Sequence, residues 1–155
     1  MFKKYGVLGV LLIVFVELNF FYKFYDLGSF YFPIIWFGYI LLLDSINYKL
    51  KKNSLISNRF NEFLGLVLAS IIFWWIFEII NIKLGNWSYN SDSLFASKNI
   101  LKGTLAFATV LPAFFETVEL IRSFHLFEKR KLHHKYKISR RFIYTMTSFG
   151  VISFL

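Results

Sequence analysis

The chain has 155 residues, of which 57% are hydrophobic and 22% aromatic, and its formal net charge is +9. A soluble domain of this size cannot bury so much apolar surface, so the composition predicts a membrane protein. The positive residues lie in short clusters between apolar runs, which is typical of membrane topology and not of a nucleic-acid-binding surface. The absence of cysteine excludes disulfides, thiolate catalysis and cysteine-ligated metals.

Apolar runs along the chain predict an all-α fold: a polytopic transmembrane helical bundle with four full helices plus the start of a fifth. The helices are expected at about residues 5–22, 30–48, 62–82, 100–124 and 142–155, in a single membrane domain spanning 1–155. The first run lacks a small-residue cleavage site, so we interpret it as an uncleaved helix and not as a signal peptide. The last run would reach only about 21 Å, short of the ~30 Å hydrocarbon core, so we expect a chain truncated at its C-terminus.

The distribution of lysine and arginine predicts the topology. Most of them lie before the first helix, in the segment 49–61 and in the segment 125–141. These parts are therefore expected on the cytoplasmic side, and the polar loop 83–99 on the outer side. The basic segment 129–141 is also expected to contact anionic lipid headgroups. Its neighbourhood holds the three histidines, His125, His133 and His134, but no Glu-x-x-His pair, so no metal site is expected.

Ionisable side chains inside the apolar runs are the candidate functional residues, because each is costly to insert into a membrane. They are Glu17, Asp44, Glu78, Glu116, Glu119 and Arg122. Depth along the helices predicts that Glu17 lies near Glu78 and Asn81. It likewise places Asp44 near Glu116, Glu119 and Arg122. The spacing of Glu119 and Arg122 favours an ion pair between them.

Helical periodicity places Ser70, Trp74, Glu78 and Asn81 within about 80° of arc on one helix face. Trp36, Ile40, Asp44 and Asn47 form a similar stripe on the second helix. The sequence Gly85-Asn-Trp87-Ser-Tyr89 follows the first stripe and predicts an aromatic lip above Glu78. Each acid also has a structural interpretation. Packing is favoured for Glu17, Asp44 and the Glu119–Arg122 pair, whereas Glu78 and Glu116 are open between packing and function.

The order FPIIWFGYILLLD, Ser54-Leu55, FWWIFEIIN, NWSY and VLPAFFET resembles a group of bacterial integral membrane proteins with no assigned function. The resemblance covers roughly residues 32–117. It implies a helical membrane fold in the bacterial inner (cytoplasmic) membrane, continued by a second helical half, and it implies no activity.

A second, narrower resemblance is to the small membrane-embedded lycopene cyclases. Glu78 stands seven residues before Gly85, and Gly85-x-Trp87-x-Tyr89 matches the Gly-x-Trp-x-Tyr of that family. Glu78 replaces the family's Asp, and Pro112 with Glu116 departs from its Pro-x-Glu-Glu. The resemblance implies that a neutral carboxylic acid protonates a polyene double bond, and aromatic faces would then stabilise the carbocation. It requires no cofactor.

These observations give two hypotheses. In the first, the protein binds an isoprenoid- or carotenoid-type lipid at an intramembrane carboxylate site. A stronger version of this hypothesis adds that the protein also modifies the lipid. The catalytic candidates are Glu78 and Glu116, and the ligand-binding candidates are Trp74, Trp75, Asn81, Trp87, Tyr89, Glu17 and Asp44. In the alternative, the chain is a non-enzymatic membrane subunit, scaffold or transporter half in a homo- or hetero-oligomer, with structural or proton-relay acids. Neither hypothesis needs a metal.

Overall fold

The computed structural model describes residues 1–25, 27, 30–89, 97–124 and 139–154, and these form helices and short connections. The elements are α1 (Lys4–Tyr22), α2 (Tyr31–Lys51), α3 (Leu55–Asn58), α4 (Phe60–Leu84), α5 (Ser97–Ser123) and α6 (Arg140–Phe154). No strand occurs in this part of the chain, so the predicted all-α class is confirmed.

Three of the described helices are long and apolar enough to cross a membrane: α1, α4 and the part of α5 from Asn99 to Ser123. Large apolar side chains stay exposed along them, among them Val7, Leu11, Val14, Leu68, Ile72, Ile76, Ile79 and Phe114. Lipid can cover such a surface, whereas water would not. The predicted membrane character of the bundle is therefore confirmed in this coarser form.

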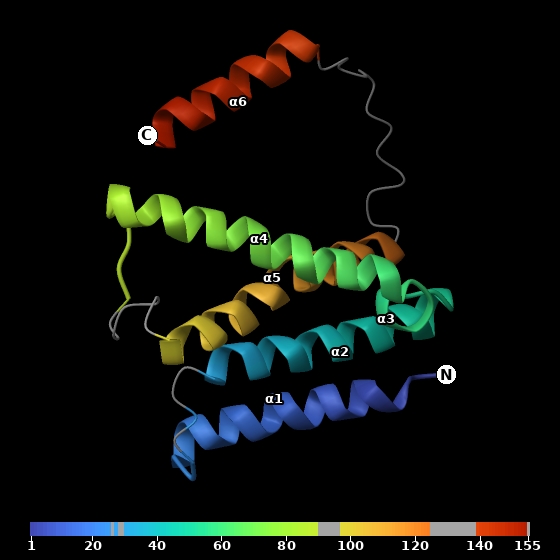
Figure 1. Cartoon of the computed structure of the whole chain (residues 1–155). Coiled ribbons are helices and arrows are strands. Elements are labelled where there is room, and N and C mark those ends of the chain that lie inside the picture. Colours follow the sequence, from blue (N-terminus) through green and yellow to red (C-terminus); the bar gives the residue numbers. More distant parts are fainter. Residues whose placement is uncertain (26, 28–29, 90–96, 125–138, 155) are drawn as a thin grey trace.

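The helices pack in the spatial order α1, α2, α5 and α4 (Figure 1). The short α3 contacts α2 and α4 where the chain passes between them. Three members of the predicted stripe of α2 face this interior, because Ile40, Asp44 and Asn47 are at most 1% exposed, whereas Trp36 is 36% exposed. Residues 139–150, at the start of α6, are exposed.

Glycines allow α1 and α2 to approach until their backbones touch. A Cβ added at Gly9 would lie 2.5 Å from the carbonyl oxygen of Gly38. A Cβ added at Gly38 would lie 2.8 Å from the carbonyl oxygen of Gly9. Small residues are the usual means of such close packing between membrane helices.

Several helix boundaries differ from the predicted ones. The second helix was expected to end at residue 48, but α2 continues to Lys51 and stops where Lys52 adopts a left-handed φ of 58°. Lysines in its last turn interact favourably with the helix C-terminus and support this extension. The helix α3 was not predicted. The third long helix, α4, begins at Phe60, two residues before the expected start, and Arg59 is its N-cap.

Ser70 of α4 hydrogen-bonds to the backbone of α5 in the turn before Pro112. Its Oγ donates to the carbonyl oxygen of Phe107 and accepts from the N–H of Leu111 at 3.1 Å. An uninterrupted α-helix would join that carbonyl and that amide directly. A neighbouring helix thus supports α5 close to its proline, as expected for proline in a membrane bundle.

Candidate functional site

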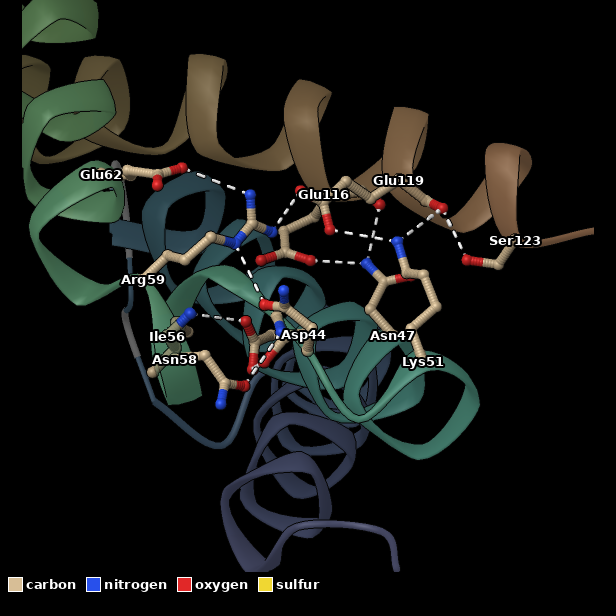
Figure 2. Close-up of polar contacts among 12 residues, drawn as sticks. Asp44, Asn47, Lys51, Ile56, Asn58, Arg59, Glu62, Glu116, Glu119 and Ser123 are labelled. Carbon is tan, nitrogen blue, oxygen red and sulfur yellow. Dashed lines mark hydrogen bonds and ion pairs between the residues drawn. The ribbon is translucent and has the colours of Figure 1, made fainter.

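The first polar cluster lies where α1, α2, α3 and α5 meet, and Asp44 is its most highly bonded member (Figure 2). Asp44 is fully buried. It accepts hydrogen bonds from Ser54 Oγ at 2.8 Å, from the N–H of Ile56 at 2.7 Å and from the Tyr5 hydroxyl. Ser54 is the N-cap residue of α3 and Ile56 lies in its first turn. Asp44 therefore caps α3 from a different helix and joins three segments of the chain.

Glu116 and Asn47 form the other half of this cluster, and both are fully buried. Asn47 Nδ2 donates to Glu116 Oε2 at 2.7 Å and to the Glu116 carbonyl oxygen at 3.0 Å. Glu116 Oε1 and Asn47 Oδ1 accept no hydrogen bond. The carboxyl group of Asp44 is close enough to interact with that of Glu116. We call Asp44, Asn47 and Glu116 the Glu116 cluster.

A charged rim borders this cluster at the same end of the bundle (Figure 2). Lys51 Nζ lies 3.2 Å from Glu119 Oε2, and Arg59 donates to Glu119 Oε1. Arg59 also pairs with Glu62 at 3.3 Å. Because the hydrogen bond from Arg59 to Glu119 favours the charged guanidinium, the pKa of Arg59 lies above its ordinary value. Arg59 is therefore permanently charged.

The predicted ion pair between Glu119 and Arg122 is wrong, because Glu119 binds Lys51 and Arg59 instead. Both partners come from other elements: Lys51 from the end of α2 and Arg59 from the junction of α3 with α4. Sequence spacing on one helix could not show that these two cations converge on the same carboxylate.

The second polar cluster, the Glu78 cluster, lies at the end of α4 and contains Glu78, Asn81, Trp87 and Tyr89. Glu78 is 4% exposed, and its Oε1 accepts from Tyr89 Oη at 2.6 Å and from Trp87 Nε1 at 3.3 Å. Asn81 bonds both the carbonyl oxygen and the N–H of Trp87, at 2.9 and 3.1 Å. Burial and then the hydrogen bond to Glu78 raise the pKa of Tyr89 to about 12.

The predicted aromatic lip above Glu78 therefore exists as a segment folded back on the helix end. The expected proximity of Glu17 to Glu78 and Asn81 is not found. Glu17 accepts from Tyr31 Oη at 2.8 Å, because α1 packs mainly on α2. Glu78 and Glu116 share no hydrogen-bond partner and belong to different clusters.

The two predicted tryptophan ligands lie in the packing interface between α4 and α5. Trp74 stacks on Phe107 with ring centroids 6.1 Å apart. Trp75 meets the same ring edge-on at 5.5 Å, and its Nε1 donates to Thr104 Oγ1 at 3.1 Å. The buried Nε1 of Trp74 has no hydrogen-bond acceptor. These contacts explain both rings as helix-packing groups.

Sequence reasoning did not identify Tyr5 and Ser54 as members of the polar core. A serine two residues beyond the lysines that end α2 is an ordinary N-cap pattern, and this signal could have revealed Ser54 and α3. Nothing in the sequence around Tyr5 indicates its contact with Asp44. The three histidines and residues 129–138 of the basic segment lie outside the described residues. Within the described ones, no group of three or more His, Asp or Glu side chains could hold a metal ion.

Comparisons of the chain with protein-family models, with curated proteins and with solved structures found no match. The functional interpretation therefore depends on the geometry of the Glu116 and Glu78 clusters.

Proposed function

We propose that the protein is a multi-pass protein of the bacterial inner membrane whose Glu116 cluster binds and exchanges a proton. In this proposal α1, α2, α4 and α5 all cross the membrane, and the chain is a non-enzymatic proton-relay subunit or half of a proton-coupled transporter. The observation that carries the proposal is the fully buried Glu116, whose Oε1 accepts no hydrogen bond and whose carboxyl group interacts with the buried carboxyl group of Asp44.

The contrast between Asp44 and Glu116 supports a proton site and not a purely structural one. Asp44 accepts three hydrogen bonds, as a structural carboxylate should. The side chain of Glu116 accepts one, from Asn47, although burying an unpaired carboxylate is costly. Two neighbouring negative charges that are shielded from water repel by several kcal/mol, on the order of 4 kcal/mol at an effective dielectric constant of about 20. A proton on the pair removes this repulsion and supplies a donor for the vacant acceptors.

The charged rim offers a route for the proton. Glu119 stands three residues after Glu116, so the two side chains lie on neighbouring turns of α5. The side chain of Glu119 is 17% exposed, whereas Glu116 is fully buried. A proton can therefore pass between the surface and the buried pair through a carboxylate one turn away.

The ends of the bundle differ in charge in the way that supports a cytoplasmic N-terminus. The N-terminus, the end of α2, the start of α4 and the end of α5 lie at the end that carries the charged rim (Figure 1). These segments hold Lys3, Lys51, Arg59 and Arg122. The opposite end carries few lysines, including Lys23 and Lys83. The positive-inside rule then places the charged rim in the cytoplasm, so the proton would exchange with that side.

Infrared difference spectroscopy on the purified protein in lipid nanodiscs tests the proton site. We expect a protonated-carboxyl band at neutral pH that the substitution Glu116→Gln removes. The matched control Glu119→Gln should retain the band, because that carboxylate pairs with two cations. A wild-type spectrum without the band, or a band unaffected by Glu116→Gln, would overturn the assignment. Proton flux into proteoliposomes that is equal for wild type and Glu116→Gln would overturn the relay.

Lipid binding at the Glu78 cluster is a second candidate function. It is favoured by a nearly buried carboxylate beneath the Trp87 and Tyr89 side chains, at the end of a helix whose other faces are apolar and exposed. The segment from Glu78 to Tyr89 resembles the corresponding segment of the lycopene cyclases, and this resemblance supports an isoprenoid-type ligand. In acid catalysis by Glu78 the proton would be carried by Oε2, because Oε1 already accepts two hydrogen bonds.

Mass spectrometry of lipids extracted from the purified protein tests this second candidate. Retention of an isoprenoid by the wild type and its loss from Glu78→Gln, but not from Glu17→Gln, would support it. Identical lipid profiles of the wild type and Glu78→Gln would refute it.

A further inference from the structure

A cavity of about 230 Å³ opens beside the charged rim and is lined by Lys51, Asn53, Arg59, Glu119 and Arg122. We call it the basic pocket. Three of its side chains are cationic and one is anionic, so its formal charge is 3 − 1 = +2. From this geometry we propose that the basic pocket binds the phosphate group of an anionic membrane lipid.

The pocket does not neutralise itself. Lys51 and Arg59 both bind the single carboxylate of Glu119. Arg122 is exposed and makes no ion pair with any residue that the structure describes. Glu62 also pairs with Arg59, so Glu119 and Glu62 together balance Lys51 and Arg59. The surplus positive charge is that of Arg122, and it is available to an external anion.

The donors divide into those that hold the pocket and those that can bind the ligand. The Arg59 guanidinium is already bonded to Asn53, Glu62 and Glu119, so it fixes the pocket wall. The Arg122 guanidinium can bind two phosphate oxygens at once, and the Lys51 ammonium can add a point charge. These two groups face the cavity from the ends of α5 and α2.

The position of the pocket favours a lipid phosphate over a free one. It lies where the membrane-crossing stretch of α4 begins and that of α5 ends, which is the level of lipid headgroups. Large apolar side chains close in sequence to its lining residues are exposed: Phe60 at 52%, Leu64 at 43% and Ile121 at 41%. A lipid whose phosphate occupies the pocket can lay its acyl chains against these side chains.

Native mass spectrometry of the full chain in detergent tests the proposal, with phosphatidylglycerol and phosphatidylcholine as probes. We expect phosphatidylglycerol to bind more tightly, and Arg122→Gln to weaken its binding about fivefold, the effect of one cation near an anionic surface. Arg122 holds no ion pair in the described fold, so this substitution should leave the protein folded. Arg122→Lys should recover only part of the affinity, because an ammonium keeps the charge but cannot bind two phosphate oxygens as a guanidinium does. The control Lys83→Gln removes the same charge at the far end of α4 and should change nothing.

Three results would contradict the inference. Equal affinity for the two lipids would overturn the assignment to an anionic lipid, and equal effects of Arg122→Gln and Lys83→Gln would overturn the site at Arg122. Displacement of phosphatidylglycerol by inorganic phosphate at the same concentration would assign the pocket to a soluble phosphate and overturn its assignment to lipid. None of these results concerns Glu116, so the basic pocket and the proton site are tested separately.

Discussion

Replacing the buried Asp44 by alanine should destabilise the protein more than the loss of any single carboxylate at the surface or in the charged rim. The substitution removes the acceptor for Ser54 Oγ, the Ile56 N–H and the Tyr5 hydroxyl. Tyr5 keeps a second partner, because its hydroxyl lies 2.7 Å from Ser57 Oγ. Two donors are then left unpaired. At about 1–3 kcal/mol for each, and with Ile56 only partly buried, we expect the free energy of unfolding to fall by about 2–4 kcal/mol.

Unfolding in mixed detergent micelles, followed by circular dichroism, measures this loss. The matched control is Glu62→Ala, which removes a carboxylate that is 62% exposed and pairs with Arg59. Exposed ion pairs contribute about 0–1 kcal/mol, so the control should be nearly neutral. Equal stabilities of Asp44→Ala and Glu62→Ala would refute the claim that Asp44 joins α1, α2 and α3.

Three further predictions follow from the same contacts. Glu116→Gln should change the free energy of unfolding by less than about 1 kcal/mol, because the amide oxygen can still accept from Asn47; a loss of about 3–5 kcal/mol, typical of a broken buried ion pair, would show that the site needs a charged Glu116. Gly38→Leu should separate α1 from α2 and prevent stable folding, seen as aggregation in size-exclusion chromatography, because even a Cβ would meet the Gly9 backbone at 2.8 Å. The difference between the absorbance titrations of the wild type and of Tyr89→Phe should show one tyrosine that ionises near pH 12, and not near the ordinary tyrosine pKa of 10.0. Because the folded-state pKa is raised, the stabilisation by the Tyr89–Glu78 bond is fully present below pH 10 and is lost as the pH rises through 12; a midpoint near 10 would contradict the bond.

Properties of single helices could be predicted from the sequence. The apolar runs indicated every long helix to within a few residues, because hydrophobicity and length alone decide which segments suit a bilayer. Periodicity also identified the buried faces. Ser70 and Glu78, both on the predicted stripe, are the two buried residues of α4. Polar groups on one face of an apolar helix have to turn inward, and this requirement needs no knowledge of the neighbouring helix.

Contacts between helices could not be predicted in the same way. Depth along the helices suggested that Glu17 lies near Glu78, yet depth does not say which helices are neighbours. The structure places α2 between α1 and α5, and Glu17 accordingly bonds Tyr31 of α2. The partners of Glu119 were missed for the same reason, since Lys51 and Arg59 reach it from two other elements.

A repeated device at two helix ends changes the interpretation of the sequence motif around Glu78. Asn81 bonds both backbone groups of Trp87, and α4 ends at Gly85 with a left-handed φ of 63°. At the end of α1, Asn19 bonds both backbone groups of Tyr25 at 2.8 and 2.9 Å, and Lys23 has a left-handed φ of 52°. The spacing is identical: the left-handed residue follows the asparagine by four positions and the aromatic residue by six. Lysine rarely takes this conformation, so the first instance is not visible in the sequence.

The acids near these two helix ends are used alike. Glu78 accepts from the hydroxyl of Tyr89, and Glu17 from the hydroxyl of Tyr31. Closing a helix end is thus a sufficient reason for an acid at position 78, whether or not a lipid also binds there. No such device surrounds Glu116: among the described residues, its Oε1 is the buried carboxylate oxygen that accepts no hydrogen bond. The strongest physical reason for assigning a function to a buried side chain is a cost of burial that no hydrogen bond compensates. In this bundle that reason applies to Glu116 and not to Glu78.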